Sequence, residues 1–555
     1  MDRNTLVAFF LIALIMIFTP YYMDIISPPQ EQPLLHSVEK DSLSTKPVIR
    51  QTAPRIASIP LTKKTPKRFD VDEQFIDIET NLFLASVSSV NGGSFQSFSL
   101  KKYKQKDSSF VELINGVNNQ NLLISYLSDD GEIVELSSPW EISSRPTFGS
   151  IHRPTKISYI AYVGPNQDLP VTKTLIFYPD KYAIDVVVDF SEARHDLLNG
   201  NFILSWNGGV SSTEANLKDD LVYFKGYAYQ GGELHDLKIK KGETQKDELP
   251  GKTDWVASRS KYFLTALIPD QPDLCSGAGV YGDYSAQNEL YDVSLSLAGS
   301  NATTTTLYLG PLEYSRVKNL GVELEQVMNF GWGFIKPISK FILWLLKKMY
   351  TLIPNYGVVL IIFAFLVKIV VFPLTKKSYQ STKAMQAVQP EINALKEKHK
   401  SNPQKLNQAT MQLYKEKGVN PLGGCIPMLI QMPLLFGLFT VFRTTIELRG
   451  KPFVFWITDL SAPDTVLHLP FSFPMYGDQV SILPILMVVS MFIQQRMMGG
   501  ANQQGQQKMM SYFMSGFFFL MFNNFPSGLN LYYTLFNVLT IAQQKWVPTN
   551  APEKQ

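Results

Sequence analysis

A set of five apolar segments constrains the fold of this chain more than any other feature. One of them, YGVVLIIFAFLVKIVVFPL from Tyr356, is almost wholly apolar yet contains Lys368. About 20 predominantly apolar residues cross the hydrocarbon core of a bilayer as a helix. We therefore expect a polytopic α-helical membrane bundle with spans at 356–374, 424–442, 480–493, 509–522 and 529–542.

The last three of these apolar segments are short. Each is 14 residues long, or about 21 Å at the helical rise, whereas the hydrocarbon core is about 30 Å thick. We therefore expect flanking polar side chains to reach the interfaces, or the bilayer to be thinner around these spans.

The N-terminal region predicts a sixth span and a tether. An arginine precedes the apolar run from Leu6 to Phe18, and Tyr21 and Tyr22 follow it. Because no small-residue cleavage site follows, we expect a transmembrane signal anchor over 1–26; a cleaved signal peptide is the alternative. Residues 27–68, which are rich in Pro, Ser, Thr and charge, predict a flexible periplasmic linker.

Residues 69–318 have the pattern of a large antiparallel β-sandwich. Asn91-Gly92 and Pro179-Asp180 are turn signals between strand-like runs, and YDVSLSLAG alternates apolar and polar residues. Residues 319–353 then predict a connector and an amphipathic helix that lies in a membrane interface. A plain core helix is the alternative for that segment.

The distribution of lysine and arginine predicts the topology. The segment 375–423 holds nine lysines and three glutamates, so it belongs on the cytoplasmic side. The sandwich is then periplasmic, and the C-terminus, with a short tail at 549–555, is cytoplasmic. This arrangement predicts a multi-pass protein of the inner membrane in a Gram-negative-type envelope.

Within that segment, residues 375–420 predict a helical hairpin. Two helical stretches, each with an apolar stripe, flank Ser401-Asn402-Pro403. A solvated positive-inside loop would explain the charge but not the stripes, so we expect a cytoplasmic docking surface. Its basic side chains are Lys376, Lys377, Lys383, Lys396, Lys398, Lys405 and Lys415.

Signatures of catalysis and of metal binding are missing from the sequence. It contains no HExxH, no Walker A loop and no GxSxG, and none of its six histidines falls inside a predicted span. Its two cysteines, Cys275 and Cys425, are too far apart for a CxxC site. We therefore expect no catalytic residues, no metal and no cofactor.

Polar residues inside the spans form the candidate site. A charge at the centre of a span costs about 2.5–3.5 kcal/mol on insertion scales, so Lys368 either reaches water along the helix or is needed where it is. Lys368, Gln431, Asn530 and Tyr533 lie on different spans and suggest a shared wet cavity, with Tyr532 and Met432 beside them. Isolated helix–helix hydrogen bonds are the alternative.

Several long motifs resemble the YidC/Oxa/Alb family of membrane-protein insertases, in the long Gram-negative form. They are YGVVLIIFAFLVKIVVFPLTKK, NPLGGCIPMLIQMPLLFGLF, FVFWITDLSAPD, ILPILMVVSMFIQQRM and FPSGLNLYYTLFNVLTIAQQ, in the family's order. The resemblance implies a five-span core over 354–548 around a hydrophilic groove open to cytoplasm and lipid. A positive residue, commonly arginine, sits in that groove and corresponds to Lys368; Tyr533 and Gln431 also match groove positions.

This chain departs from the family at three places. Lysine replaces the usual arginine and loses its planar fork, Ala364 replaces a common threonine, and the region 446–479 is longer than usual. The implied function is a membrane protein insertase and chaperone, not an enzyme. Its expected partners are nascent membrane proteins, the ribosome, Sec translocon components, the signal-recognition-particle receptor and the lipid bilayer, with no specific nucleic-acid sequence.

Other classes stay open on the sequence alone. A polar-solute transporter would also place charged residues in its spans, although internal repeats are missing. A glycan-active enzyme or a carbohydrate-binding scaffold could act through the sandwich, and the former would need paired carboxylates in a cleft.

Overall fold

The computed structural model describes residues 63–64, 71–114, 120–145, 150–284, 289–399, 402–419, 426–473, 475–499 and 505–546. The predicted signal anchor, most of the predicted linker and the C-terminal tail lie outside these residues. Contacts divide the chain into two units: residues 1–59 with 503–514, and residues 60–502 with 515–555. The sheets and all described helices, apart from the first part of α10, belong to the second unit.

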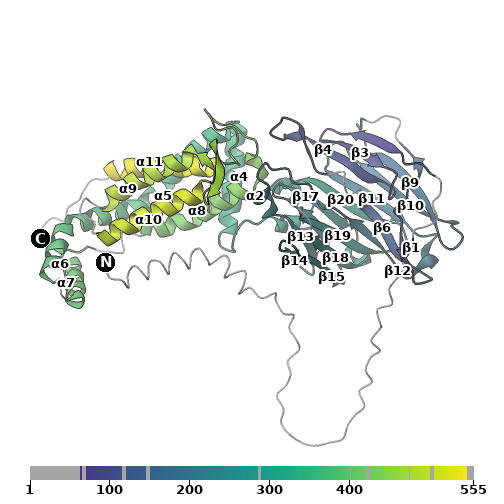
Figure 1. Ribbon diagram of the computed structural model, residues 1–555, viewed down its shortest axis with the longest axis horizontal. Helices are drawn as coiled ribbons and strands as arrows, with labels where there is room; N and C mark the ends of the chain where they lie inside the picture. The colour runs from purple at the N-terminus through teal and green to yellow at the C-terminus, as the bar shows by residue number, and fades with distance from the viewer. Residues whose placement is uncertain are drawn as a thin grey trace, which may run out of the picture. The chain divides into compact units, whose positions relative to one another are not determined.

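Two large sheets and a smaller one form the β-sandwich (Figure 1). The seven-stranded sheet runs in the order β1 (Lys63–Lys64), β7 (Ile133–Glu135), β6 (Asn121–Ser128), β12 (Leu197–Trp206), β19 (Leu290–Ala298), β18 (Cys275–Asp283) and β15 (Thr244–Pro250). The nine-stranded sheet runs in the order β14 (Glu233–Leu237), β13 (Lys225–Gln230), β16 (Trp255–Arg259), β17 (Phe263–Pro269), β20 (Thr303–Pro311), β11 (Ala183–Asp189), β10 (Leu169–Phe177), β9 (Thr155–Val163) and β8 (Glu141–Ser144).

The third sheet of the sandwich has four strands. They are β2 (Phe75–Glu79), β3 (Phe83–Ser88), β4 (Ser94–Lys104) and β5 (Phe110–Glu112). Phe95 of β4 lies 6.2 Å from the ring of Phe177 and 6.3 Å from the ring of Trp206, centroid to centroid, so one side chain joins all three sheets. Buried apolar side chains at alternate strand positions fill the space between the sheets.

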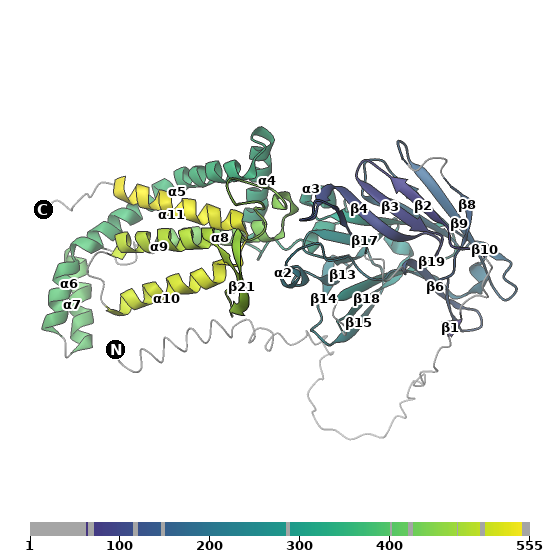
Figure 2. The same ribbon diagram turned by 45° about the horizontal axis from the view of Figure 1, so that its top comes forward.

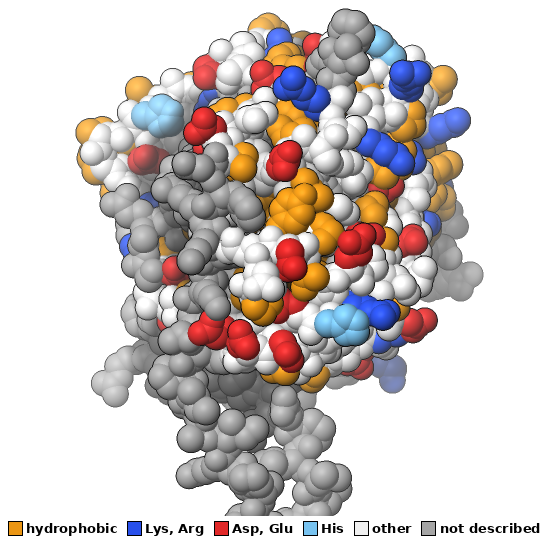
Figure 3. All heavy atoms as spheres, turned by 90° about the vertical axis from the view of Figure 1, so that its right-hand side faces the viewer, with side chains coloured by type: hydrophobic (Ala, Val, Ile, Leu, Met, Phe, Trp, Pro, Cys, Tyr) orange, Lys and Arg blue, Asp and Glu red, His pale blue; other side chains and the backbone are white. Residues whose placement is uncertain are grey.

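The predicted sandwich is confirmed, with one correction. Lys63 and Lys64 fall in the segment predicted as a linker, but they form β1 and pair in parallel with β7, so the sandwich is not wholly antiparallel. The turn signal Asn91-Gly92 does join two antiparallel strands, β3 and β4. Gly92 has a φ of +68° and lies against Trp140, where a Cβ atom would approach the ring to 2.7 Å. Figure 3 shows acidic, basic and scattered apolar side chains mixed over one face of this domain.

A lysine lies fully buried inside the sandwich. Lys173 of β10 is 0% exposed, and its Nζ donates to the carbonyls of Asn91 at 3.0 Å and Leu122 at 2.6 Å. Burial lowers the pKa of Lys173 from its ordinary 10.5 to about 7. Between these two values the unfolded chain binds more protons than the folded chain, so stability rises with pH across this window.

We therefore expect the sandwich to become more stable by on the order of 2 kcal/mol between pH 7 and pH 9, since one proton contributes about 1.4 kcal/mol per pH unit. Urea unfolding followed by the fluorescence of the buried tryptophans measures this. Lys173→Met is the control and should flatten the pH dependence. An equal slope in both proteins would contradict the assignment.

The long helices of the chain are preceded by several short helices in the sandwich and connector. These are η1 (Arg194–Asp196), α2 (Leu217–Leu221), η2 (Pro272–Leu274), α3 (Tyr314–Lys318) and η3 (Leu324–Val327). The longer helices are α4 (Lys336–Leu352), α5 (Tyr356–Ala387), α6 (Gln389–Lys398), α7 (Pro403–Glu416), α8 (Ile426–Thr444), α9 (Ile482–Gly499), α10 (Gly505–Phe522) and α11 (Ser527–Trp546). A 3₁₀ turn, η5 (Ile446–Leu448), follows α8. Helices α5, α8, α9 and α11 run side by side (Figure 2).

Helices α9, α10 and α11 are longer than the apolar segments that predicted them. Helices α9 and α10 have 18 residues each and α11 has 20, which is about 27–30 Å. Polar residues extend α9 at its C-terminal end, α10 at its N-terminal end and α11 at both ends. Among the described residues, Tyr356–Lys376 is long and apolar enough to cross a membrane, and Ile482–Met497 is a shorter apolar stretch. The predicted count of six spans thus goes beyond what the helices establish by length and composition.

Helix α4 is amphipathic. Its face of Ser339, Ile342, Leu343 and Leu346 is buried, whereas Phe341 and Trp344 are 58% and 59% exposed and stack on each other. On its polar side, Lys347 donates to Glu313 at 3.2 Å and to Glu447 at 3.1 Å. An exposed aromatic face beside a flank of lysines is typical of a helix that lies in a membrane interface.

Candidate functional site

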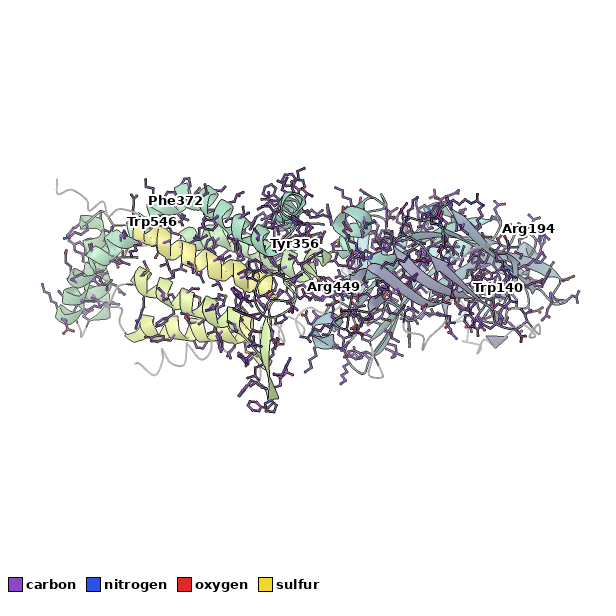
Figure 4. The ribbon with its side chains drawn as sticks, turned by 90° about the horizontal axis from the view of Figure 1, so that it is seen from above. Trp140, Arg194, Tyr356, Phe372, Arg449 and Trp546 are labelled. Atoms are coloured by element: carbon purple, nitrogen blue, oxygen red, sulfur yellow. The ribbon has the colours of Figure 1, made fainter. Side chains whose placement is uncertain are left out.

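Helix α11 is the helix around which the candidate site is built. Its buried residues face several neighbours: Phe363 of α5 lies 5.9 Å from the ring of Tyr532, and Asn537 Nδ2 donates to Ser490 Oγ of α9 at 3.3 Å. Figure 4 places Phe372 and Trp546 at one end of the helices, and Tyr356 and Arg449 at the other. Helices α5 and α11 therefore run in the same direction and end on the same side.

The side chain of Lys368 is buried at the contact of α5 with α11. The side chain is 6% exposed, its Nζ donates to Thr540 Oγ1, and the same nitrogen lies 3.5 Å from the centroid of the Phe536 ring. Thr540 Oγ1 in turn donates to the Phe536 carbonyl at 2.7 Å. The alternative in which Lys368 extends along the helix to water is therefore wrong. A desolvated cation over an aromatic face gains about 2 kcal/mol, which offsets part of the cost of burial.

The two tyrosines point to different helices. Tyr532 is 1% exposed and packs on Phe363 and Phe536, and its hydroxyl is buried without a partner. Tyr533 is 7% exposed, and its hydroxyl donates to the Leu435 carbonyl of α8 at 3.4 Å. An orphaned hydroxyl at this depth is costly, so Tyr532 offers a donor to any polar group that enters.

Asn530 acts at the turn between α10 and α11. Its Nδ2 donates to the carbonyls of Phe522 at 3.1 Å and Phe525 at 3.4 Å, which belong to the end of α10 and the turn that follows it. The side chain is fully buried, and its Oδ1 has no partner. The side chain therefore satisfies a helix end, and only its acceptor oxygen is left for other chemistry.

Gln431 and Met432 lie on α8 instead. Gln431 is half-buried and Met432 is 38% exposed. The structure thus separates the six predicted groove residues into a buried group, Lys368, Asn530, Tyr532 and Tyr533, and an accessible pair on α8. Thr540 and Phe536 complete the buried group. They lie seven and three residues after Tyr533, and this helical spacing is the signal that could have identified them.

The basic segment forms a helix pair on the side where α5 ends. Helices α6 and α7 pack through a small separate core of Val388, Ile392, Leu413 and Val419. Met411, an apolar residue of the second helical stretch, is 61% exposed and lies outside this core. Helix α5 continues through Pro373 to Ala387, so about the first half of the first predicted helix of the hairpin is an extension of α5, and the rest forms α6. Of the predicted docking lysines, Lys376, Lys398, Lys405 and Lys415 are exposed and Lys383 and Lys396 are half-buried, while the side chain of Lys377 lies outside the described part.

The segment 459–464 caps two helices of the bundle. Asp464 Oδ2 accepts from the amides of Ile482 at 3.1 Å and Leu483 at 2.8 Å, at the start of α9. The carbonyls of Ala462 and Leu460 accept from Ser527 at 2.8 Å and Gly528 at 3.0 Å, at the start of α11. The motif FVFWITDLSAPD gives no local signal of this role, because the capped amides are distant in the sequence.

The sandwich contains a small polar hollow of about 140 Å³. Its lining includes Asp283 and Asp292, which are paired carboxylates of the kind a glycan-active enzyme needs, but Asp292 Oδ1 already accepts from the Gly208 amide at 2.7 Å. Ligand pockets usually enclose about 300–1,000 Å³, so this hollow is small for a sugar. Among the residues described, no group of three or more His, Cys, Asp or Glu could hold a metal ion.

Two family models together match most of the chain. The 60Kd inner membrane protein family matches residues 348–554, and the YidC periplasmic domain matches residues 75–345. Membrane protein insertase YidC of Chlorobaculum parvum is 36% identical over 99% of this chain and 94% of its own length. The protein of the same name from Prosthecochloris aestuarii is 35% identical over 99% of this chain and 95% of its own length.

Solved structures give weaker likenesses. A crystal structure of active YidC insertase with the first transmembrane domain resolved covers 86% of this chain and 93% of its own, with 17% identity and a TM-score of 0.36. A galactose mutarotase related enzyme from Lactobacillus acidophilus covers 42% of this chain and 97% of its own, with 10% identity and a TM-score of 0.29.

Proposed function

This chain belongs to the YidC family of membrane protein insertases, and from this premise we propose that it admits polar parts of nascent membrane proteins among its helices and releases their apolar parts into lipid. The observation that carries the proposal is Lys368, a lysine buried between two helices with one hydroxyl and one aromatic face as its contacts. A charge at this position lowers stability. We infer that the lysine is kept because it binds polar parts of the substrate.

The proposed route begins at the accessible pair on α8. Gln431 and Met432 receive the hydrophilic tail or short loop of the substrate, since a half-buried amide offers hydrogen bonds and a methionine adapts to many apolar shapes. Deeper in, Lys368 attracts acidic residues of the tail, while the Tyr532 hydroxyl and the Asn530 oxygen offer a donor and an acceptor without partners. The groove of the family opens here when the helices around α11 part.

Lipid partitioning drives the process. Burial of apolar surface yields about 0.8 kcal/mol per CH₂ group, so a span of about 20 apolar residues gains tens of kcal/mol without a nucleotide. The obstacle is the passage of the polar tail. In this proposal the protein spans the inner membrane six times, with the sandwich in the periplasm and the C-terminus in the cytoplasm, and works alone or with the Sec translocon.

The experiment that tests the proposal is cross-linking from position 431. We expect a photoreactive residue at 431 to cross-link to the hydrophilic tail of a ribosome-stalled nascent membrane protein. The matched control is position 203 in the sandwich, since Ile203 is 41% exposed on β12 and should give no product. A product of equal yield at both positions, or at neither, would count against the proposal.

Helices α6 and α7 are proposed to receive the ribosome, whose RNA attracts lysines through counterion release. Replacing Lys396, Lys398, Lys405 and Lys415 by glutamate should lower co-sedimentation with ribosomes at least tenfold at low salt and remove its salt dependence. The hairpin core is untouched, so the fold should persist. Asn407→Ala with Gln408→Ala, also exposed on α7, is the neutral control. Unchanged sedimentation of the glutamate variant would refute the docking role.

A further inference from the structure

The long region after η5 folds into a hairpin that the function above does not use. Strands β21 (Thr465–Phe473) and β22 (Gly477–Ser481) pair antiparallel, and β22 leads directly into α9. The register shifts between His468 and Phe473, so the intervening residues bulge out of the pairing. An isolated two-stranded hairpin is marginal in water, and such a hairpin needs a surface to lie on.

The outer side chains of this hairpin are apolar. Val466, Leu467, Phe471, Phe473 and Met475 are between 45% and 57% exposed, and the rings of Phe471 and Phe473 meet edge to face at 5.0 Å. Over residues 465–481 the sequence holds one acidic residue and one histidine, with no lysine or arginine. Contact with an apolar or amphipathic environment stabilises such a surface, whereas a charged environment stabilises it little.

The turn of the hairpin and its second strand are held by two asparagines of the turn after α10. Asn523 Nδ2 donates to the carbonyls of Tyr476 at 2.9 Å and Gln479 at 2.6 Å. Asn524 Nδ2 donates to the carbonyls of Met475 at 2.9 Å and Tyr476 at 3.1 Å. These bonds fix the orientation of the hairpin, and Figures 2 and 4 show it running across the direction of the helices, at the end where α9 begins.

The apolar surface of the hairpin continues that of the helices. Directly after β22, the side chains of Ile485, Leu486, Val489 and Ile493 on α9 are 40–51% exposed, as expected where a membrane helix meets lipid. Close to the start of β21, Phe455 is 90% exposed and stacks on Trp456, whose Nε1 donates to Asp464 at 2.9 Å. Aromatic side chains gather at membrane–water interfaces, whereas an open sheet edge cannot enter the hydrocarbon core.

We propose that the β21–β22 hairpin lies flat in the periplasmic interface of the bilayer, with Leu467, Phe471 and Phe473 inserted at the boundary between headgroups and acyl chains. The inference rests on the proposed function in one respect, namely that the helices span the membrane. Its occupant is lipid: the surface is apolar, nearly uncharged and continuous with the lipid-facing side of α9. The insertion anchors the end of the bundle where α9 begins and should not depend on anionic lipids.

The test uses the full chain with Cys275→Ser and Cys425→Ser, reconstituted into phosphatidylcholine vesicles. Single cysteines at 471, 369 and 75 carry an environment-sensitive fluorophore, and lipids with a nitroxide at a shallow or a deep acyl position quench it. Ile369 is 72% exposed on α5 and Phe75 is 58% exposed on β2, so they report the span and the aqueous domain.

We expect the label at 471 to be quenched at least twofold more strongly by the shallow than by the deep nitroxide, to be shielded from aqueous iodide, and to be unaffected by 30% phosphatidylglycerol. Quenching at 369 but not at 471 would overturn the inference and leave the proposed function standing. Quenching at neither position would overturn both. A label at 471 that is shielded from iodide yet unquenched by either lipid would show that protein covers the hairpin, which also refutes the proposal.

Discussion

Replacement of Lys368 by methionine is expected to lower the insertion of substrates with acidic tails by about 10- to 100-fold. The side chain is the buried cation at the contact of α5 and α11, and a hydrogen bond to a charged group contributes about 1.5–3 kcal/mol, where 1.36 kcal/mol is tenfold in rate. Methionine is unbranched and one atom shorter than lysine and removes the charge, so the bundle should stay folded. Insertion of radiolabelled substrates into vesicles containing each variant measures the effect.

Two further variants separate charge from structure. Lys368→Arg keeps the charge and should retain most of the activity. Thr540→Val removes only the hydroxyl that Lys368 contacts and should leave insertion of acidic substrates within about threefold, because the ammonium then turns to the substrate. Substrates whose tails carry no acidic residue should be inserted alike by all three proteins. If Lys368→Met lowers the insertion of both substrate classes equally, the charge of Lys368 does not act on acidic tails.

The sequence identified Lys368 but could not identify its partner. The lysine stands out because a charge interrupts an apolar run, whereas Thr540 lies 172 residues away, in a span that contains several hydroxyl and amide side chains. A threonine in a helix usually bonds its own preceding turn, and Thr540 does so too. Asn530 was predicted for its polarity, yet its donors are used by the end of α10, which only the fold could reveal.

Elements with a strong local signal were predictable, and those fixed by distant contacts were not. The sandwich follows from alternation and from turns such as Asn91-Gly92, whose left-handed backbone few other residues adopt. The end of α5 did not follow, because Pro373 and the lysines mark the edge of the apolar run while the helix continues to Ala387. The β21–β22 hairpin has weak alternation, and its shape depends on Asn523 and Asn524 of another segment.

The cap of α9 by Asp464 also joins residues that are far apart in the sequence, and we expect its loss to have a large effect on stability. Its Oδ2 accepts from the first two amides of α9 and from the Trp456 indole, and the side chain is 4% exposed. Helix α9 has its own polar residue at its start, Ser481, but that hydroxyl is directed to the Asn523 carbonyl at 3.4 Å. The helix end therefore depends on a carboxylate from before the hairpin.

We expect Asp464→Ala to lower the free energy of unfolding by about 2–3 kcal/mol, because a buried donor left without an acceptor costs about 1–3 kcal/mol. The Leu483 amide is buried, whereas the Ile482 amide and the Trp456 indole are only part-buried and lose less. Unfolding in mixed detergent micelles, followed by the loss of protection of the Ile482 and Leu483 amides from hydrogen exchange, measures it. Asp464→Asn keeps an acceptor oxygen and should lose less than half as much.

Asp478→Ala removes an exposed carboxylate of the same hairpin and should change stability by less than about 0.5 kcal/mol. This control matters because both substitutions remove one negative charge from the same end of the bundle, so a general charge effect would move both variants equally. If Asp464→Ala is no more destabilised than Asp478→Ala, the carboxylate does not hold the start of α9. In that case the apolar contacts of α9 with α11, not its cap, determine where the helix begins.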